Sequence, residues 1–170
     1  GVSQRRAAKI LKVNPKTVVR HFRFLAMIAR QSHQCWLKSN YSDRPLELVQ
    51  FDDLETSEQT KCKPLSVALA VDPVKRKILN FQVASMPAKG HLSKVAVKKY
   101  GYRKDQRGVA WSNMMQQLMP FVSKKAVWTS DENPHYPKHL FRFHPGATHL
   151  AFKGGRGCIT GQGELKKLKY

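Results

Sequence analysis

Two aspartates close two apolar runs whose composition is typical of β-strands. Asp52 follows the run that begins at Leu46, and Asp131 follows the run that begins at Lys125. Carboxylates are scarce in this chain, which has 11 Asp and Glu against 31 Lys and Arg and a formal net charge of +20. A carboxylate at a strand end favours a cationic partner, and in a chain that attracts phosphate the simplest partner is a divalent metal. The pattern predicts metal-assisted chemistry on a polyanion; the alternative is that both residues are turn aspartates that only end their strands.

Metal-assisted phosphoryl chemistry sets a geometric requirement on these residues. Oxygen ligands must converge from separate strands, so that two ions about 3.5–4 Å apart hold the attacking and leaving oxygens. Mg²⁺ is a hard cation that prefers carboxylates. Asp53 lies next to Asp52, but successive side chains of a strand point to opposite faces, so only one of the two can be the first carboxylate of the site. We choose Asp52 for this role and keep Asp53 as the alternative.

The composition is typical of a globular protein that binds nucleic acid. The 170 residues suit one domain plus a small module, and 41% hydrophobic residues are enough to form a core. The pI near 10.2 favours a polyanionic partner over a merely solvated basic surface. No apolar run approaches ~18 residues, so we expect no membrane span. The three cysteines are far apart and odd in number, which indicates a reducing compartment rather than a disulfide framework.

The first forty residues predict a helical hairpin with one basic face. Ser3 is a suitable N-cap for a short helix, Asn14 caps a second helix, and Pro15 suits the first turn of that second helix. We expect the second helix to end near Ala29. Val18, Phe22 and Leu25 form an apolar stripe along this helix. Lys16, Arg20 and Arg23 form a basic stripe about 200° away around the helix, on its opposite side. This is the arrangement of a helix-turn-helix, and the plain alternative is an amphipathic hairpin with solvated charges.

These residues resemble the Gly-Val-Ser-x-x-x-x-Ala-x-x-Leu-x-Val-x-x-x-Thr-Val pattern of transposase and resolvase DNA-binding modules. The resemblance implies that Lys16, Thr17 and Arg20 face the major groove, with Arg5, Arg6 and Arg23 as further DNA contacts. The chain opens inside the motif and without an initiator Met, so we expect a truncated or processed chain with an incomplete module over residues 1–30. Residues 31–45 are polar and end in a turn-rich cluster, which predicts a linker.

Residues 46–170 have the pattern of an α+β domain. Strand-like runs at 46–54, 65–71 and 77–84 have short connections, which predicts an antiparallel meander. The order continues with a basic stretch over 94–107, a helix over 109–122, a strand over 126–129, a short helix over 137–143 and a strand over 149–152. This order resembles the ribonuclease-H-like fold, a mixed sheet flanked by helices with carboxylates on its first strand and at the end of its fourth.

Order, spacing and motifs together resemble the DDE-type transposases of bacterial insertion sequences. The carriers are Val49-Gln50-Phe51-Asp52-Asp53-Leu54 and Thr129-Ser130-Asp131, followed by Tyr136. The resemblance implies a Mg²⁺- or Mn²⁺-dependent enzyme that nicks DNA at element ends and transfers the freed 3′-OH to a target. Asp52 and Asp131 are then its first and second catalytic aspartates and its metal ligands. It further implies a homo-oligomer on double-stranded transposon-end and target DNA, in the nucleoid of a bacterial cytoplasm.

A third carboxylate is the open question of this resemblance. Glu164 lies 33 residues after Asp131 and is our candidate, although it is otherwise a solvated residue at a helix start. The family's last ligand lies on a long helix, so we expect the core to be truncated at its C-terminus. Lys153 and Arg156, in the Gly-rich loop over 153–157, are candidate contacts to DNA phosphate.

Four histidines and two broader alternatives complete the predictions. His135, His139, His144 and His149 have no Cys-x-x-Cys beside them, so we expect a DNA-facing surface or the edge of the active site rather than a zinc site. The first alternative for the whole chain is a non-catalytic DNA-binding protein or an inactive transposase remnant. The second is a structure-selective nuclease of the same fold.

Overall fold

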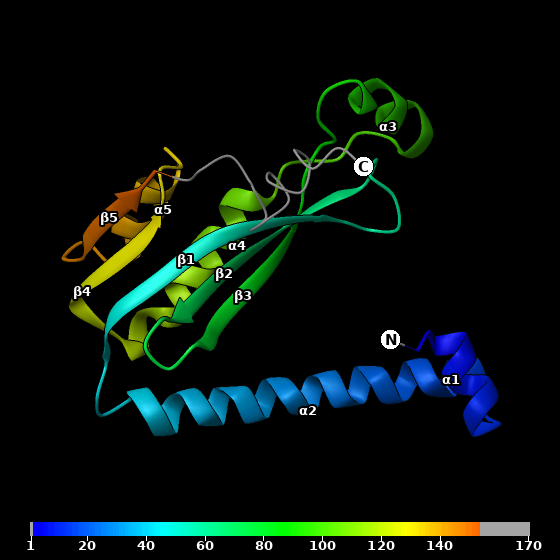
Figure 1. Ribbon diagram of the computed structural model, residues 1–170, viewed down its shortest axis with the longest axis horizontal. Coiled ribbons are helices and arrows are strands. Elements are labelled where there is room, and N and C mark those ends of the chain that lie inside the picture. Colours follow the sequence, from blue (N-terminus) through cyan, green and yellow to red (C-terminus); the bar gives the residue numbers. More distant parts are fainter. Residues whose placement is uncertain (1, 154–170) are drawn as a thin grey trace, which may run out of the picture. The chain divides into compact units, whose positions relative to one another are not determined.

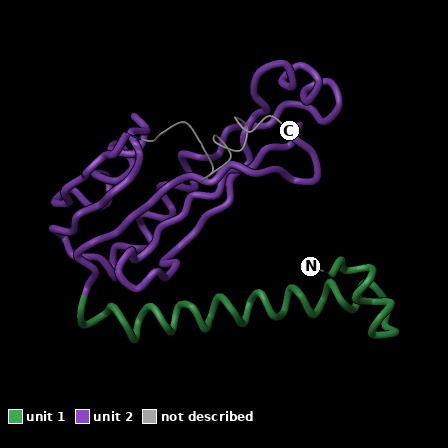
Figure 2. Tube along the Cα trace, in the orientation of Figure 1, with its two compact units in different colours: residues 1–44 green, residues 45–170 purple. Residues whose placement is uncertain are grey.

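The computed structural model describes residues 2–153 of the chain. The chain divides into two compact units, Gly1–Arg44 and Pro45–Tyr170, shown in different colours in Figure 2. Each unit is described by itself below. The predicted residues Arg156 and Glu164 lie outside the described residues. No helix in the described range 2–153 combines the length and the apolar character that a membrane crossing needs.

The first unit consists of two helices joined by a tight turn. Helix α1 spans Gln4–Leu11, and its N-cap Ser3 accepts a hydrogen bond from the backbone of Arg6, as predicted. Helix α2 spans Pro15–Tyr41, and the Asn14 side chain accepts from the Lys16 amide at 2.9 Å. Lys12 makes the turn in the left-handed region, at φ 52°. Both capping predictions are therefore confirmed.

Two features of α2 differ from the sequence prediction. The helix does not end near Ala29 but continues to Tyr41, so most of the predicted linker over 31–45 is helical. The predicted apolar stripe is present on the helix, yet Phe22 and Leu25 are each 62% exposed. The linker prediction relied on polar composition and on the turn-rich cluster at the end of the segment. Polar residues such as Gln, Ser and Lys are compatible with an exposed helix, which explains the error.

The second unit is built on a five-stranded mixed sheet with the order β3-β2-β1-β4-β5 (Figure 1). Its strands are β1 Leu46–Ser57, β2 Pro64–Asp72, β3 Lys77–Ser85, β4 Val122–Asp131 and β5 Thr148–Phe152. The first three strands form the predicted antiparallel meander. β4 then pairs in parallel with β1, and β5 pairs in parallel with β4. The unit is thus an α+β domain in which the first and fourth strands are neighbours.

Helices α4 and α5 cover one face of this sheet. α4 spans Arg107–Leu118, is followed by a 3₁₀ turn at Met119–Phe121, and packs on β2 and β3. α5 spans Tyr136–Phe143 and packs on α4. The core lies between these helices and the alternate residues of the strands that point toward them, including the fully buried Val49, Ala68 and Trp128. Helix α3, Leu92–Tyr100, was not predicted as a helix, because its lysines suggested only a basic stretch.

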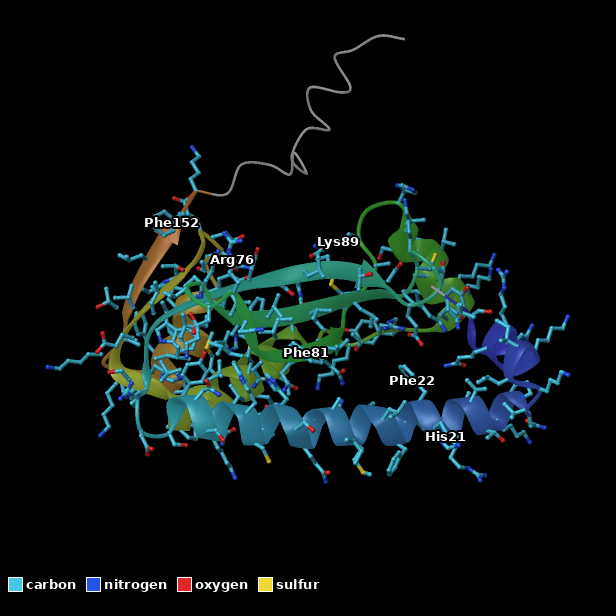
Figure 3. All side chains as sticks on the ribbon, turned by 60° about the horizontal axis from the view of Figure 1, so that its bottom comes forward. His21, Phe22, Arg76, Phe81, Lys89 and Phe152 are labelled. Atoms are coloured by element: carbon cyan, nitrogen blue, oxygen red, sulfur yellow. The ribbon has the colours of Figure 1, made fainter. Side chains whose placement is uncertain are left out.

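The opposite face of the sheet exposes apolar side chains on β3. Phe81 projects from this strand (Figure 3) and is 49% exposed, and Ile78 and Val83 are 50% and 55% exposed. Leu79, between them on the helix-covered face, is fully buried. Leu79 and Phe81 are two residues apart yet differ in burial, because the pairing with β2 skips Leu79 and this irregularity shifts the alternation of β3 by one residue.

Candidate active site

The sheet places Asp52 and Asp131 at equivalent positions on neighbouring strands. The parallel register pairs Gln50 of β1 with Thr129 of β4, and each aspartate lies two residues further along its strand. Neighbouring strands are about 4.8 Å apart, and residues two apart share a face, so both carboxylates lie on one side of the sheet. Both residues are exposed. The two predicted site residues are therefore brought together.

Asp53 lies on the other face, as the alternation of the strand requires. It is half-buried beside Phe51, and its carboxylate accepts a hydrogen bond from the hydroxyl of Ser66 on β2. Burial raises the pKa of Asp53, while the Ser66 hydrogen bond and the positive charge of Arg107 act in the opposite direction. One carboxylate oxygen of Asp53 is thus already engaged within the protein. Within residues 2–153, Asp52 accepts a hydrogen bond only from the adjacent backbone amide, at 2.7 Å.

Tyr136, the first residue of α5, lies among these carboxylates. Its ring is buried and packs against Phe51, with ring centroids 4.8 Å apart, and against Trp111, at 4.9 Å. The pKa of the Tyr136 phenol is strongly raised, first by burial and then by the negative charges of Asp131, Asp52 and Asp53. The phenol therefore stays protonated near neutral pH, under the influence of the negative charge of all three carboxylates.

A pocket of about 190 Å³ adjoins this region on the helical face. Its lining consists of Asp105, Arg107, Gly108, Trp111, His135 and His139. Arg107 donates from Nη2 to Asp105 at 2.6 Å and from Nε at 3.0 Å, so its charge is held by a bidentate pair. Burial lowers the pKa of His139, and the nearby Lys138, His135 and Arg142 lower it further. The pocket thus presents neutral imidazole and paired guanidinium groups beside the carboxylates.

The acidic residues supply part of a metal site. In the range 2–153 there is no group of three or more His, Cys, Asp or Glu side chains arranged to hold a metal ion. Asp52 and Asp131 are exposed carboxylates on adjacent strands, the ligand type and mounting that Mg²⁺ or Mn²⁺ requires. Asp131 accepts one backbone hydrogen bond, from Asn133 at 3.2 Å, and its second oxygen accepts none from the described residues. The chemistry of this pair fits a divalent cation that takes its remaining ligands from water, substrate phosphate or a third residue.

Three of the four histidines make separate side-chain contacts, and His135 lines the pocket together with His139. His139 contacts the Ser112 hydroxyl, His149 contacts the Ser130 hydroxyl, and Nε2 of His144 donates to the carbonyl of Met115 at 3.1 Å. His144 is only 4% exposed, so the prediction that it lies on a surface is wrong. Its burial follows from its position just after α5, where its ring packs on Trp128.

The predicted DNA contacts of the first unit lie on its surface. Arg5, Arg6, Lys16, Arg20 and Arg23 are exposed and Thr17 is partly exposed. Lys153 is exposed directly after β5. These side chains are available to a ligand, which is a condition for the predicted role.

Sequence reasoning missed Ser66, Arg107 and the pocket beside the carboxylates. Ser66 is the one hydroxyl in an otherwise apolar strand, and it lies on the covered face, where a polar group needs a partner. This hydroxyl on a buried face of the strand could have identified Ser66 from the sequence. The effect of the Arg107 charge on Asp53 had no local signal, because the two residues are far apart in the sequence and lie on different elements, α4 and β1.

Comparison with known proteins gives no match, either among protein-family models or among curated proteins.

Proposed function

We propose that this chain is a metal-dependent DNA transposase with a ribonuclease-H-like core and an N-terminal helix-turn-helix. The observation that carries the proposal is the parallel register of β1 and β4, whose last pair, Gln50 and Thr129, lies two residues before Asp52 and Asp131. The resemblance in sequence requires carboxylates on the first and fourth strands. The sheet order β3-β2-β1-β4-β5 makes those strands neighbours, which the linear sequence alone did not require.

In the proposed site Asp52 and Asp131 hold the metal, and Asp53 has a supporting role. A bound Mg²⁺ or Mn²⁺ would supply the charge that stabilises the phosphate under attack and would orient the attacking oxygen. Asp52 is preferred over Asp53 because it is exposed on the face of Asp131, while Asp53 is committed to Ser66. Tyr136 would act as a buried spacer that keeps the strand ends and α5 together, since its proton does not leave near neutral pH.

The DNA partner is supported by charge. The excess of 31 Lys and Arg over 11 acidic residues favours binding of phosphate polymers of any sequence. Helix α2 adds an exposed basic stripe of Lys16, Arg20 and Arg23 after a capped N-terminus, which is the arrangement that reads a major groove. Sequence-specific binding to element ends is thus assigned to the first unit and cutting to the second.

The test is nicking of supercoiled plasmid carrying the element ends, followed on agarose gels with Mg²⁺, Mn²⁺ or EDTA. We expect metal-dependent nicking by the full chain, and its loss in both Asp52→Asn and Asp131→Asn. The matched control is Glu47→Gln, an exposed carboxylate near the start of the same strand β1. Unchanged nicking in the two aspartate variants contradicts the assignment of the metal ligands.

A second candidate is a DNA-binding protein without catalysis. It is favoured by the absence of a three-residue metal group in residues 2–153. The two proposals differ in metal binding. A site on the native state raises stability by about 2.7 kcal/mol at a Mn²⁺ concentration 100 times its Kd, whereas a chain without a site shows no rise of Tm with Mn²⁺.

A further inference from the structure

Residues 58–63 and 86–106 form a compact basic lobe beyond the end of β1. The lobe consists of the β1–β2 loop and of the segment around α3, which stands apart from α4 and α5 at one end of the sheet (Figure 1). It contains eight Lys and Arg against two acidic residues. None of the residues predicted from the sequence to contact DNA belongs to this basic lobe.

The basic lobe is held together by specific contacts. Lys63 of the β1–β2 loop places its ammonium group 4.8 Å from the centroid of the Tyr100 ring, at the end of α3. Arg103 pairs with Glu58 of the same loop at 3.4 Å. The lobe has a small interior cavity of about 70 Å³ lined by residues of both segments, among them Cys62 and Ala96. The loop and α3 therefore form one structure rather than two independent loops.

Most of the positive charge of the basic lobe has no acidic partner. Lys89, which is labelled in Figure 3, pairs with Glu55 of β1. Among the described residues no acidic side chain lies within ion-pair distance of the exposed Lys61, Lys94, Lys98, Lys99 and Lys104. Such a concentration of unpaired charge favours a polyanion, because the counterions condensed on the polyanion are released when it binds.

An exposed aromatic ring lies in the middle of this charge. Tyr102 is 79% exposed on the extended segment after Gly101, between α3 and α4. Gly101 has φ 79° and ψ 178°, a conformation that is essentially restricted to glycine, so the turn that presents Tyr102 is built into the chain. An exposed ring flanked by cations is a stacking platform for an unpaired base.

The basic lobe is continuous with the segment that leads to Asp53, the neighbour of Asp52 on β1. The segment that carries Tyr102 continues through Gln106, whose amide donates to the Ser85 carbonyl at 3.0 Å, to Arg107, whose charge acts on Asp53. Along β1, Asp53 is four residues from Ser57, a distance of about 13 Å at 3.3 Å per residue.

We propose that the basic lobe binds an unpaired DNA strand on its way to or from the carboxylate site, with a base stacked on Tyr102 and phosphates on the lysines of α3. The role of this strand in cutting rests on the proposed function. The binding itself does not, because it needs neither the metal nor the aspartates. Basic charge tracks the backbone, and the aromatic ring makes the site prefer an unpaired strand over a duplex, whose bases are already stacked.

The experiment measures fluorescence anisotropy of labelled 20-nucleotide DNA, single-stranded or duplex, with the full chain in EDTA. Tyr102→Ala should weaken single-strand binding by on the order of tenfold, while Tyr102→Trp retains it. Lys98→Gln with Lys99→Gln should reduce the salt dependence of single-strand binding by about 1.4 in log–log slope. The matched control is Lys124→Gln with Lys125→Gln, which changes two exposed lysines on β4. These lysines lie near the start of β4, which pairs with the start of β1, at the opposite end of that strand from Ser57 and the basic lobe.

Three results would overturn the inference. The first is single-strand affinity unchanged in Tyr102→Ala. The second is an equal loss in the control lysine pair. The third is loss of binding to anionic vesicles, without loss of DNA binding, in the Lys98 and Lys99 variant, which would assign the basic lobe to a membrane surface. Failure of the proposed function gives a different result. In that case Asp52→Asn leaves plasmid nicking unchanged, and the affinity for single-stranded DNA does not enter that result.

Discussion

Phe51 is the residue through which the fold holds the two carboxylate strands together, and its removal gives the sharpest stability prediction. It lies on β1 directly before Asp52 and is 2% exposed. Its ring contacts three others on three elements: Trp128 of β4 at 5.7 Å, Tyr136 of α5 at 4.8 Å and His149 of β5 at 5.8 Å. Truncation therefore removes packing against β4, α5 and β5.

The magnitude follows from burial and ring contacts. Truncating a buried Phe to Ala costs about 3–5 kcal/mol, and each aromatic pair is worth about 0.5–1.5 kcal/mol beyond the buried area. We expect Phe51→Ala to lower the free energy of unfolding by about 4 kcal/mol, a large part of the roughly 5–15 kcal/mol of a typical domain. At about 2 kcal/mol per molar urea, the midpoint of unfolding falls by about 2 M.

The same sheet offers a matched control in Phe81. This residue is 49% exposed on the uncovered face of β3, so truncation leaves no closed cavity. Phe81→Ala should cost about 1 kcal/mol, roughly half the transfer energy of a fully buried side chain. Urea unfolding followed by far-UV circular dichroism measures both variants. Equal midpoint shifts for Phe51→Ala and Phe81→Ala would refute the described packing.

Three further predictions concern other parts of the molecule. Burial lowers the pKa of His144 below 6.5, so the unfolded chain takes up the extra proton and stability falls as the pH drops below that value. His144→Gln should reduce the loss of unfolding free energy between pH 7.5 and pH 5; an identical loss would contradict this. A Cβ at Gly146 would lie 2.7 Å from the carbonyl oxygen of Lys124, so Gly146→Ala should cost about 1–3 kcal/mol in thermal unfolding. An unchanged Tm would show that the loop adjusts freely. Asn14→Ala removes the side chain that caps the Lys16 amide, and the loss of such a cap costs about 1 kcal/mol. Amide hydrogen exchange in the first turn of α2 should therefore accelerate about fivefold. Exchange that is as slow as in the original chain would mean that the cap contributes nothing.

The sequence predicted the strands better than it predicted the helices. The meander of β1, β2 and β3 was predicted because alternating and apolar runs with short connections leave few other pairings. Helix α3 was missed because apolar residues such as Val95 and Val97 are about half exposed, and its many lysines concealed the helical period. The length of α2 was missed because an exposed helix has no need of an apolar stripe along its whole length.

The candidate site was predicted in its strand residues and not in its surroundings. Asp52 and Asp131 could be found because each one ends an apolar run, and a strand fixes the direction of the side chains along its length. Burial raises the pKa of Asp53, and the opposing effects of Ser66 and Arg107 come from β2 and α4. Contacts between elements far apart in sequence follow from tertiary packing, and no local pattern reports them.

The central claim is that Asp52 and Asp131 bind one divalent cation between two neighbouring strands. The most direct measurement is the binding isotherm of Mn²⁺ to the full chain, read from the electron paramagnetic resonance signal of free Mn²⁺. We predict saturable binding that is at least tenfold weaker in Asp52→Asn and in Asp131→Asn, each loss being about 1.4 kcal/mol or more, and unchanged in Glu47→Gln. Indistinguishable isotherms for all four proteins would contradict the claim.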